Sequence, residues 1–128
     1  MKYLIASLLT VILSSFATLA PSAELAFDQS QFDAARAAGK PVAVVFHADW
    51  CPTCRAQAPV LKNLLQTPEL KSVTLFVANF DTEKALKKSL KVTQQSTVIV
   101  FRAGKEVARS TGDTRQDSLD ALLRQALS

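Results

Sequence analysis

The stretch GKPVAVVFHADWCPTCRAQAP, residues 39–59, contains both cysteines of the chain and the segment that decides its fold. A continuous apolar run from Val42 to Phe46 predicts a central strand that is buried on both faces. Cys51 and Cys54 follow it with two residues between them, and we expect a helix to begin near Cys51. This spacing suits a redox dithiol, half of a metal site or a structural disulfide.

The pair points to chemistry rather than to stability. A disulfide across so short a loop would constrain the unfolded chain little. A helix N-terminus stabilises an anion, so we expect the pKa of Cys51 to fall into the range of about 3.5–7.5. Pro52 suits the first helical turn, and Arg55 adds a nearby positive charge or is a solvated surface group. Cys54, one turn deeper, is expected to resolve a mixed disulfide formed at Cys51.

The first 23 residues have the order of a secretory signal. Lys2 is followed by an apolar run from Leu4 to Leu19 and then by small residues, and we favour cleavage after Ala23. The alternative is an uncleaved membrane anchor, but five serine and threonine residues interrupt the run. We therefore expect a signal peptide at 1–23, a folded domain at 24–128, and a periplasmic protein whose mature form is not anchored in a membrane.

The charge balance argues against a nucleic-acid partner. The 128-residue chain has a formal net charge of +4, which falls to +3 when Lys2 is removed with the signal. This charge is mildly basic and spread out along the chain, which does not suggest a nucleic-acid binder. The length suits one domain, and we expect a monomer.

Helical and strand patterns alternate along the rest of the chain. We expect a helix over residues 30–40, with Ser30 as N-cap and Gly39 as its stop, and a helix after Cys51 that Pro59 kinks. The other expected elements are a strand at 73–79, a helix at 81–91, a hairpin of strands at 97–101 and 106–110, and a last helix carrying Leu119, Leu122, Leu123, Ala126 and Leu127. This order predicts a three-layer α/β fold. Its central mixed sheet would have about four strands flanked by helices, and it would end in a β-hairpin and a C-terminal helix.

The segment HADWCPTCRAQAP resembles the active site of the thioredoxin-like family. The segments GKPVAVVFHADWC, FVANFDTEKALKKSLKV and STVIVFRAGKEVARSTGD extend the likeness over residues 30–127, and the most similar member is the C-terminal periplasmic domain of the disulfide interchange protein DsbD. The resemblance implies a thiol–disulfide oxidoreductase with no cofactor beyond a redox-active Cys51–Cys54 disulfide. Its partners would be protein thiols and disulfides, together with a redox partner such as a DsbD-like membrane electron donor, and it would act as a reductant.

The resemblance also implies roles for neighbouring residues. Cys51 would attack and Cys54 would resolve, and Pro59 would be the helix-kink proline. The substrate groove would be lined by Trp50, Pro52, Thr53, Gln95, Ser96 and Thr97.

Two positions depart from the family pattern. Ser96 stands where the family usually has a cis-proline facing the cysteines, and we expect a trans bond between Gln95 and Ser96 because a cis bond before serine costs about 2.5–4 kcal/mol. Val45 stands where a buried acid usually takes the proton of the resolving thiol. A slower resolving step, or one that acts through water, would follow.

A binding protein is the alternative function. The two thiolates would suit copper, zinc or an iron–sulfur cluster, or they would hold one dedicated partner in a lasting mixed disulfide. His47, the only histidine, is a proton carrier or third ligand under one interpretation and a packed imidazole under another. A four-ligand zinc site cannot be built from these residues alone, so the preferred interpretation is a redox enzyme with no metal site.

Overall fold

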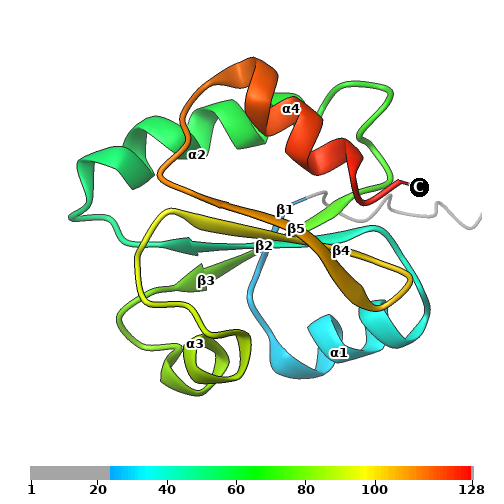
Figure 1. The fold of residues 1–128 in the computed structure, drawn as a ribbon, viewed down its shortest axis with the longest axis horizontal. Coiled ribbons are helices and arrows are strands. Elements are labelled where there is room, and N and C mark those ends of the chain that lie inside the picture. The colour runs from blue at the N-terminus through cyan, green and yellow to red at the C-terminus, as the bar shows by residue number, and fades with distance from the viewer. Residues whose placement is uncertain (1–23, 128) are drawn as a thin grey trace, which may run out of the picture.

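Five strands form one mixed sheet in the computed structural model, which describes residues 24–127 (Figure 1). The elements in chain order are β1 (Glu24–Ala26), α1 (Gln29–Ala37), β2 (Val42–His47), α2 (Pro52–Leu64), β3 (Thr74–Asn79), α3 (Lys84–Leu90), β4 (Thr97–Arg102), β5 (Lys105–Thr111) and α4 (Gln116–Arg124). Helices α2 and α4 cover one face of the sheet, and α1 and α3 cover the other. The predicted three-layer α/β fold is confirmed. The predicted signal peptide at 1–23 lies outside the described residues.

The apolar run after Pro41 forms the centre of the sheet. The strand order is β1-β3-β2-β4-β5, with β2 parallel to β3 and antiparallel to β4. Val42 to Phe46 are all buried, as the continuous apolar pattern predicted. Because open α/β sheets place chemistry beyond the carboxyl ends of their strands, the end of β2 positions the segment that carries Cys51.

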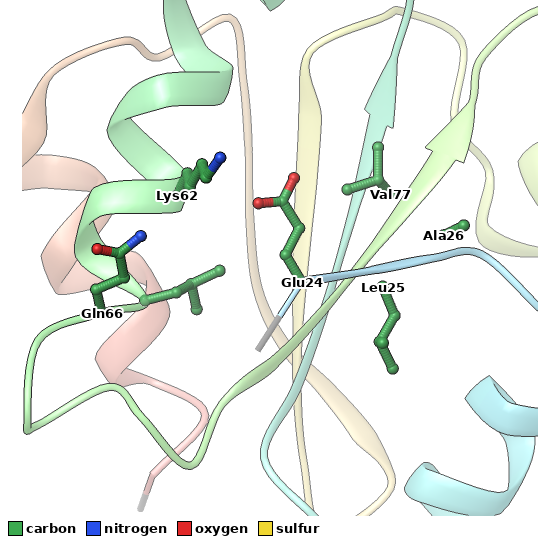
Figure 2. A pocket seen from close by; sticks show the side chains of 7 residues that line it. Glu24, Leu25, Ala26, Lys62, Gln66 and Val77 are labelled. Carbon is green, nitrogen blue, oxygen red and sulfur yellow. The ribbon is translucent and has the colours of Figure 1, made fainter. Parts of the chain in front are cut away.

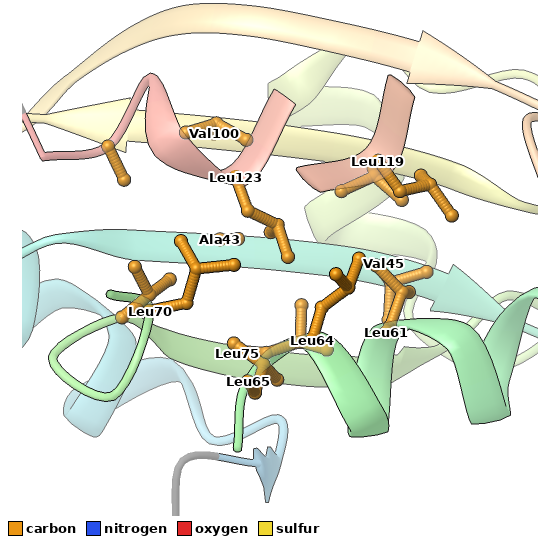
Figure 3. Packing of buried hydrophobic residues seen from close by; sticks show 13 residues of the cluster. Ala43, Val45, Leu61, Leu64, Leu65, Leu70, Leu75, Val100, Leu119 and Leu123 are labelled. Carbon is orange, nitrogen blue, oxygen red and sulfur yellow. The ribbon is translucent and has the colours of Figure 1, made fainter. Parts of the chain in front are cut away.

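Alternate residues of β2 enter two separate cores. Ala43 and Val45 face α2 and α4, where they pack with Leu61, Leu119 and Leu123 (Figure 3). The other face of the sheet has a second core, whose buried residues are Phe32, Val42, Val44, Phe46, Phe76, Ala78, Leu86, Val92, Ile99 and Phe101. The period-two alternation of a strand therefore divides one apolar run between two helical layers.

Two details differ from the expectation. The sheet, expected to have about four strands, has five, because the three residues of β1 pair in parallel with β3 from Glu24–Leu75 to Ala26–Val77. The N-cap of α1 is Asp28 and not Ser30, since the Asp28 carboxylate accepts the backbone N–H of Gln31 at 2.9 Å. Both residue types cap helices well, and here the carboxylate also accepts the Ser30 hydroxyl at 2.9 Å.

The remaining elements lie near their predicted positions with shifted ends. The helix predicted at 81–91 begins at Lys84. The turn at Ala103 and Gly104 has φ values of 50° and 80°, which match the twist of a tight hairpin. The last helix ends at Arg124, although Ala126 beyond it is still buried. Within residues 24–127, the structure contains no helix with the length and apolar character of a membrane span.

Candidate active site

Cys51 lies at the junction between β2 and α2. It is the N-cap residue of α2, with extended backbone angles of −88° and 116°, and Pro52 is the first helical residue. Its sulfur accepts the backbone N–H of Cys54 at 3.3 Å. The thiol therefore takes the place of the hydroxyl or carboxylate that usually caps a helix, and it receives a donor that favours its charged form.

Cys54 lies one helical turn deeper and is fully buried. Its sulfur is 2.8 Å from the Ser96 hydroxyl oxygen and 4.0 Å from the backbone oxygen of Phe46. Ala48 is buried in the same cluster, and Phe80 packs against it. Both cysteines are free thiols, so the structure represents the reduced dithiol.

The surroundings of the two sulfurs push their pKa values apart. Desolvation opposes ionisation of Cys51, but hydrogen bonds from Cys54 and from the side chains of Ser96 and Gln95 outweigh it and lower the pKa of Cys51 to about 7. Desolvation raises the pKa of Cys54, and the neighbouring Cys51 raises it further. The Ser96 hydroxyl acts in the opposite direction on the pKa of Cys54. Near neutral pH the negative charge therefore belongs to Cys51.

Ser96 has an unusual backbone conformation. The bond before it is trans, as predicted, and its φ is 60°, in the left-handed region that serine rarely adopts. This conformation turns the side chain toward the cysteines. Its hydroxyl oxygen lies 2.8 Å from the Cys54 sulfur and 3.7 Å from the Cys51 sulfur. The sequence marked Ser96 as a departure from the family pattern but did not indicate this geometry.

Three hydrogen bonds hold the Ser96 backbone. Its N–H donates to the Phe46 carbonyl at 2.8 Å, and its carbonyl accepts the N–H of Gly112 at 3.0 Å. That carbonyl also accepts the side-chain amide of Gln57 at 3.2 Å, and the same amide donates to the Asp113 carbonyl at 2.9 Å. Gln57 is buried on α2 and was not identified from the sequence. A polar residue on an otherwise apolar helix face was the only available signal.

A hollow of about 250 Å³ opens beside Cys51. Three of the predicted groove residues, Thr53, Gln95 and Ser96, line it together with Cys51. The sequence did not identify the other lining residues, which are Gln94, Thr111 and Gly112. Trp50, Pro52 and Thr97 are not part of this lining. The hydroxyl of Thr97 instead pairs with that of Thr111 at 2.9 Å.

Three predicted residues lie around the site, and their described hydrogen bonds are not to the sulfurs. Trp50 is 58% exposed, and its indole N–H donates to the Asp81 carboxylate at 2.8 Å. The His47 ring nitrogen lies 2.9 Å from the Asp49 carboxylate. Arg55 is exposed on the first turn of α2. A groove role for Trp50 and modulating roles for His47 and Arg55 stay predictions.

The position of the family's buried acid is apolar in the structure as well as in the sequence. Val45 is 4% exposed and belongs to the core beneath α2 and α4. Behind it lies a cavity of about 100 Å³, which is lined by Glu24, Val45, His47, Gln57, Ala58, Leu61, Leu75 and Val77. The carboxylate that lines this cavity therefore comes from β1 and not from β2.

A larger hollow of about 580 Å³ lies at the β1 edge of the sheet. It lies between β1 and the end of α2, with Glu24 and Lys62 on opposite walls (Figure 2). None of the predicted site residues lines it. Its lining is Glu24, Leu25, Ala26, Lys62, Leu65, Gln66 and Val77.

Among residues 24–127, no three His, Cys, Asp or Glu side chains come together in an arrangement that would hold a metal ion. His47 contacts Asp49 in the hydrogen bonds described above, and the sulfurs contact Ser96. The metal-binding hypothesis stays a prediction.

Comparison with known proteins gives a consistent result over most of the chain. The thioredoxin family model matches residues 23–125. The thioredoxin of Chlamydia pneumoniae is 36% identical over 94 residues, which cover 73% of this chain and 89% of that protein. The thioredoxin of Alicyclobacillus acidocaldarius is 30% identical over 105 residues, which cover 82% of this chain and 99% of that protein.

Solved structures agree with this result. The crystal structure of Trxlp from Edwardsiella tarda EIB202 has 40% sequence identity and a TM-score of 0.76, and the match covers 78% of this chain and 97% of that chain. The thioredoxin of Malassezia sympodialis, at 21% identity and a TM-score of 0.72, covers 82% of this chain and 93% of its own and supports the fold alone.

The difference in pKa between Cys51 and Cys54 predicts how the alkylation rate of each thiol depends on pH. Only the thiolate reacts, so the alkylation rate at Cys51 should rise with pH through a midpoint of about 7 and level off above it. Cys54 should react more slowly throughout, because its pKa is raised and its sulfur is buried. Iodoacetamide labelling from pH 5 to 10, read by mass spectrometry of the peptides, measures both rates. Faster labelling at Cys54 than at Cys51 would contradict the assignment.

Proposed function

Because this chain belongs to the thioredoxin family of thiol–disulfide oxidoreductases, we propose that Cys51 attacks protein disulfides and that Cys54 resolves the mixed disulfide. One observation carries the assignment: Cys51 lines the 250 Å³ hollow, whereas Cys54 does not line it and is fully buried. A pKa of about 7 gives Cys51 a substantial thiolate fraction at neutral pH. A substrate sulfur therefore meets the charged thiol first.

The first step forms a mixed disulfide. The electron pair of the Cys51 thiolate forms a bond to one sulfur of the substrate disulfide, and the substrate S–S bond breaks. The departing sulfur leaves as a thiolate and takes a proton from solvent. The nearby helix N-terminus and the Cys54 N–H, 3.3 Å from the Cys51 sulfur, favour the thiolate that begins this step.

The second step releases the substrate. Cys54 gives up its proton to a solvent base, and its electron pair forms the bond to the Cys51 sulfur. The bond between Cys51 and the substrate breaks, and the second substrate sulfur leaves and is protonated. The protein dithiol has then lost two electrons to the substrate disulfide, which has become two thiols. The reaction itself needs no organic cofactor, and a further redox protein must reduce the Cys51–Cys54 disulfide.

The substrate groove of this proposal is the hollow together with its rim. Thr53, Gln95 and Ser96 line the hollow beside Cys51. The exposed indole of Trp50 adds an apolar surface next to the attacking cysteine. Pro52 and Thr97 adjoin these residues in the chain. The partners would be protein thiols and disulfides, with a DsbD-like membrane protein as electron donor, and we expect the protein to act as a monomer without nucleic acid.

The cysteine roles predict different outcomes for the two single variants. Cys51→Ser should abolish reduction of a protein disulfide, because it removes the attacking sulfur. Cys54→Ser should retain attack and accumulate a mixed disulfide at Cys51, because the resolving sulfur is absent. Non-reducing electrophoresis and mass spectrometry after incubation with a disulfide-containing protein detect the adduct. Accumulation of the adduct in Cys51→Ser instead would reverse the two roles.

The direction of electron flow predicts the reduction potential. A reductant should equilibrate with graded thiol–disulfide buffers near the value of thioredoxin, about −270 mV. The measurement follows the Cys51–Cys54 disulfide by alkylation of the reduced fraction. A value near about −120 mV would mark an oxidant and overturn the reductant proposal.

We propose a periplasmic location from the predicted signal at residues 1–23. The full chain expressed in a Gram-negative host should be recovered in the periplasmic fraction, and its N-terminal residue, read by sequencing, should be Glu24. A Leu9→Arg variant, which interrupts the apolar run, should remain in the cytoplasm uncleaved. Recovery of the wild-type chain in the cytoplasm with its first residues intact would exclude this location.

A further inference from the structure

The Ser96 hydroxyl lies between the two thiols. Its oxygen is 2.8 Å from the Cys54 sulfur and 3.7 Å from the Cys51 sulfur. Ser96 is 1% exposed, and Cys54 is fully buried. A hydroxyl in this position is a hydrogen-bonding group next to a sulfur that is buried in the reduced protein.

Resolution of the mixed disulfide requires charge on that buried sulfur. Cys54 must become a thiolate before it attacks, and desolvation opposes this change. The neighbouring position on β2, where a carboxylate would assist, is the apolar side chain of Val45. The Phe46 carbonyl, 4.0 Å from the Cys54 sulfur, is an acceptor and cannot stabilise an anion. The Ser96 hydroxyl lowers the pKa of Cys54 most, and a backbone hydrogen bond from Ala48 lowers it less.

We propose that Ser96 is a catalytic residue of the resolving step, in which its hydroxyl donates a hydrogen bond to the Cys54 sulfur as that sulfur becomes a thiolate. The inference rests on the proposed function, because it presupposes that Cys54 resolves.

The hydroxyl serves both protonation states of Cys54. In the reduced dithiol it accepts the Cys54 S–H and is free to donate toward the charged Cys51 sulfur. In the mixed disulfide Cys51 carries no charge. When the Cys54 proton leaves to a solvent base, the hydroxyl hydrogen rotates toward Cys54, whose electron pair then forms the bond to Cys51. Ser96 loses no proton in the cycle, so its contribution is electrostatic stabilisation of the nucleophile.

The backbone of Ser96 is fixed before the reaction. Its N–H and carbonyl are held by Phe46, Gly112 and Gln57, so the hydroxyl rotates on an immobile support. The left-handed φ of 60° persists because these three bonds hold it. A donor that is already positioned needs no reorganisation when the charge appears.

The pH dependence of the resolving step should reflect the ionisation of Cys54. Titratable side chains on the surrounding elements are Cys51 on α2, His47 on β2, Glu24 on β1, Lys87 on α3 and Asp113 after β5. His47 and Glu24 line the cavity behind Val45, Lys87 lies over the ring of Phe80, and Asp113 meets Gln57 through its backbone carbonyl. Of these five, Cys51 alone has its pKa lowered by the Ser96 hydroxyl, so its thiolate fraction is measured separately in each Ser96 variant.

Single-turnover kinetics separate attack from resolution. The reduced protein is mixed with equimolar 5,5′-dithiobis(2-nitrobenzoate), which releases one coloured thiolate when Cys51 attacks and a second when Cys54 resolves. Cys54→Ser identifies the first phase, since it cannot complete the second. The test variants are Ser96→Ala and Ser96→Gly. Both lack the hydroxyl, but glycine adopts a positive φ without strain.

Ser110→Ala is the matched control. Ser110 lies on β5, and its buried hydroxyl has no hydrogen-bond partner among the described residues. The substitution also removes a serine hydroxyl, but this one lies on β5 and is not hydrogen-bonded to either sulfur. It should leave both phases within about twofold of the wild-type rates.

Both Ser96 variants should slow the second phase by about tenfold or more at pH 7, the size expected when a hydrogen bond to a charged group is lost. The first phase, corrected for the measured thiolate fraction of Cys51, should change by less than about threefold. The pH midpoint of the second phase should rise by about one unit. Thermal unfolding of each variant confirms that it is folded.

Two results would overturn the inference. One is a second phase that keeps the wild-type rate in both variants. The other is a slow second phase in Ser96→Ala that Ser96→Gly restores, because backbone strain and not the hydroxyl would then explain the loss. A wild-type protein that releases only one coloured thiolate would overturn the proposed resolving role of Cys54, and this inference with it.

Discussion

Both backbone edges of β2 are hydrogen-bonded and both of its faces are buried, and the end of this strand sets the position of every group in the site. The Phe46 carbonyl accepts the Ser96 N–H at 2.8 Å, and the His47 carbonyl accepts the Phe80 N–H at 2.9 Å. At the first residue after β2, the Ala48 carbonyl accepts the Cys51 N–H at 3.1 Å. Hydrogen bonds to the end of β2 and to the residue after it therefore fix the positions of both the cysteine turn and the Ser96 loop.

This arrangement resolves a conflict between the two thiols. Cys51 raises the pKa of Cys54, whereas the hydrogen bond from Cys54 lowers the pKa of Cys51, so the two sulfurs ionise at different pH values. The helix N-terminus and the wall of the hollow favour charge on Cys51, whereas burial keeps Cys54 protonated until it is needed. Ser96 touches both sulfurs, so its hydroxyl is available to whichever one is charged at a given step.

The sequence predicted the features that depend on residue pattern. The apolar run of β2, the cysteine spacing and the helix order are all local signals, and the structure confirms the fold that follows from them. Strand β1 was missed because three residues have no usable period. Gln57 was missed because its partners, Ser96 and Asp113, lie 39 and 56 positions away, and no local pattern reports such a contact. The contact between Ser96 and Cys54 was missed for the same reason, because 42 positions separate the two residues.

The three hydrogen bonds that hold the Ser96 backbone involve only uncharged groups, so the position of its hydroxyl does not depend on their ionisation. A left-handed serine costs about 1–2 kcal/mol, and three hydrogen bonds at about 1 kcal/mol each offset that cost. The Gln57 amide does not titrate, and the loop it joins is held by Asp113, whose pKa is lowered by the Ser118 hydroxyl and the Arg115 backbone N–H. That carboxylate stays ionised across the neutral range. The support of the hydroxyl is therefore constant across the neutral range, while the two sulfurs change their charge.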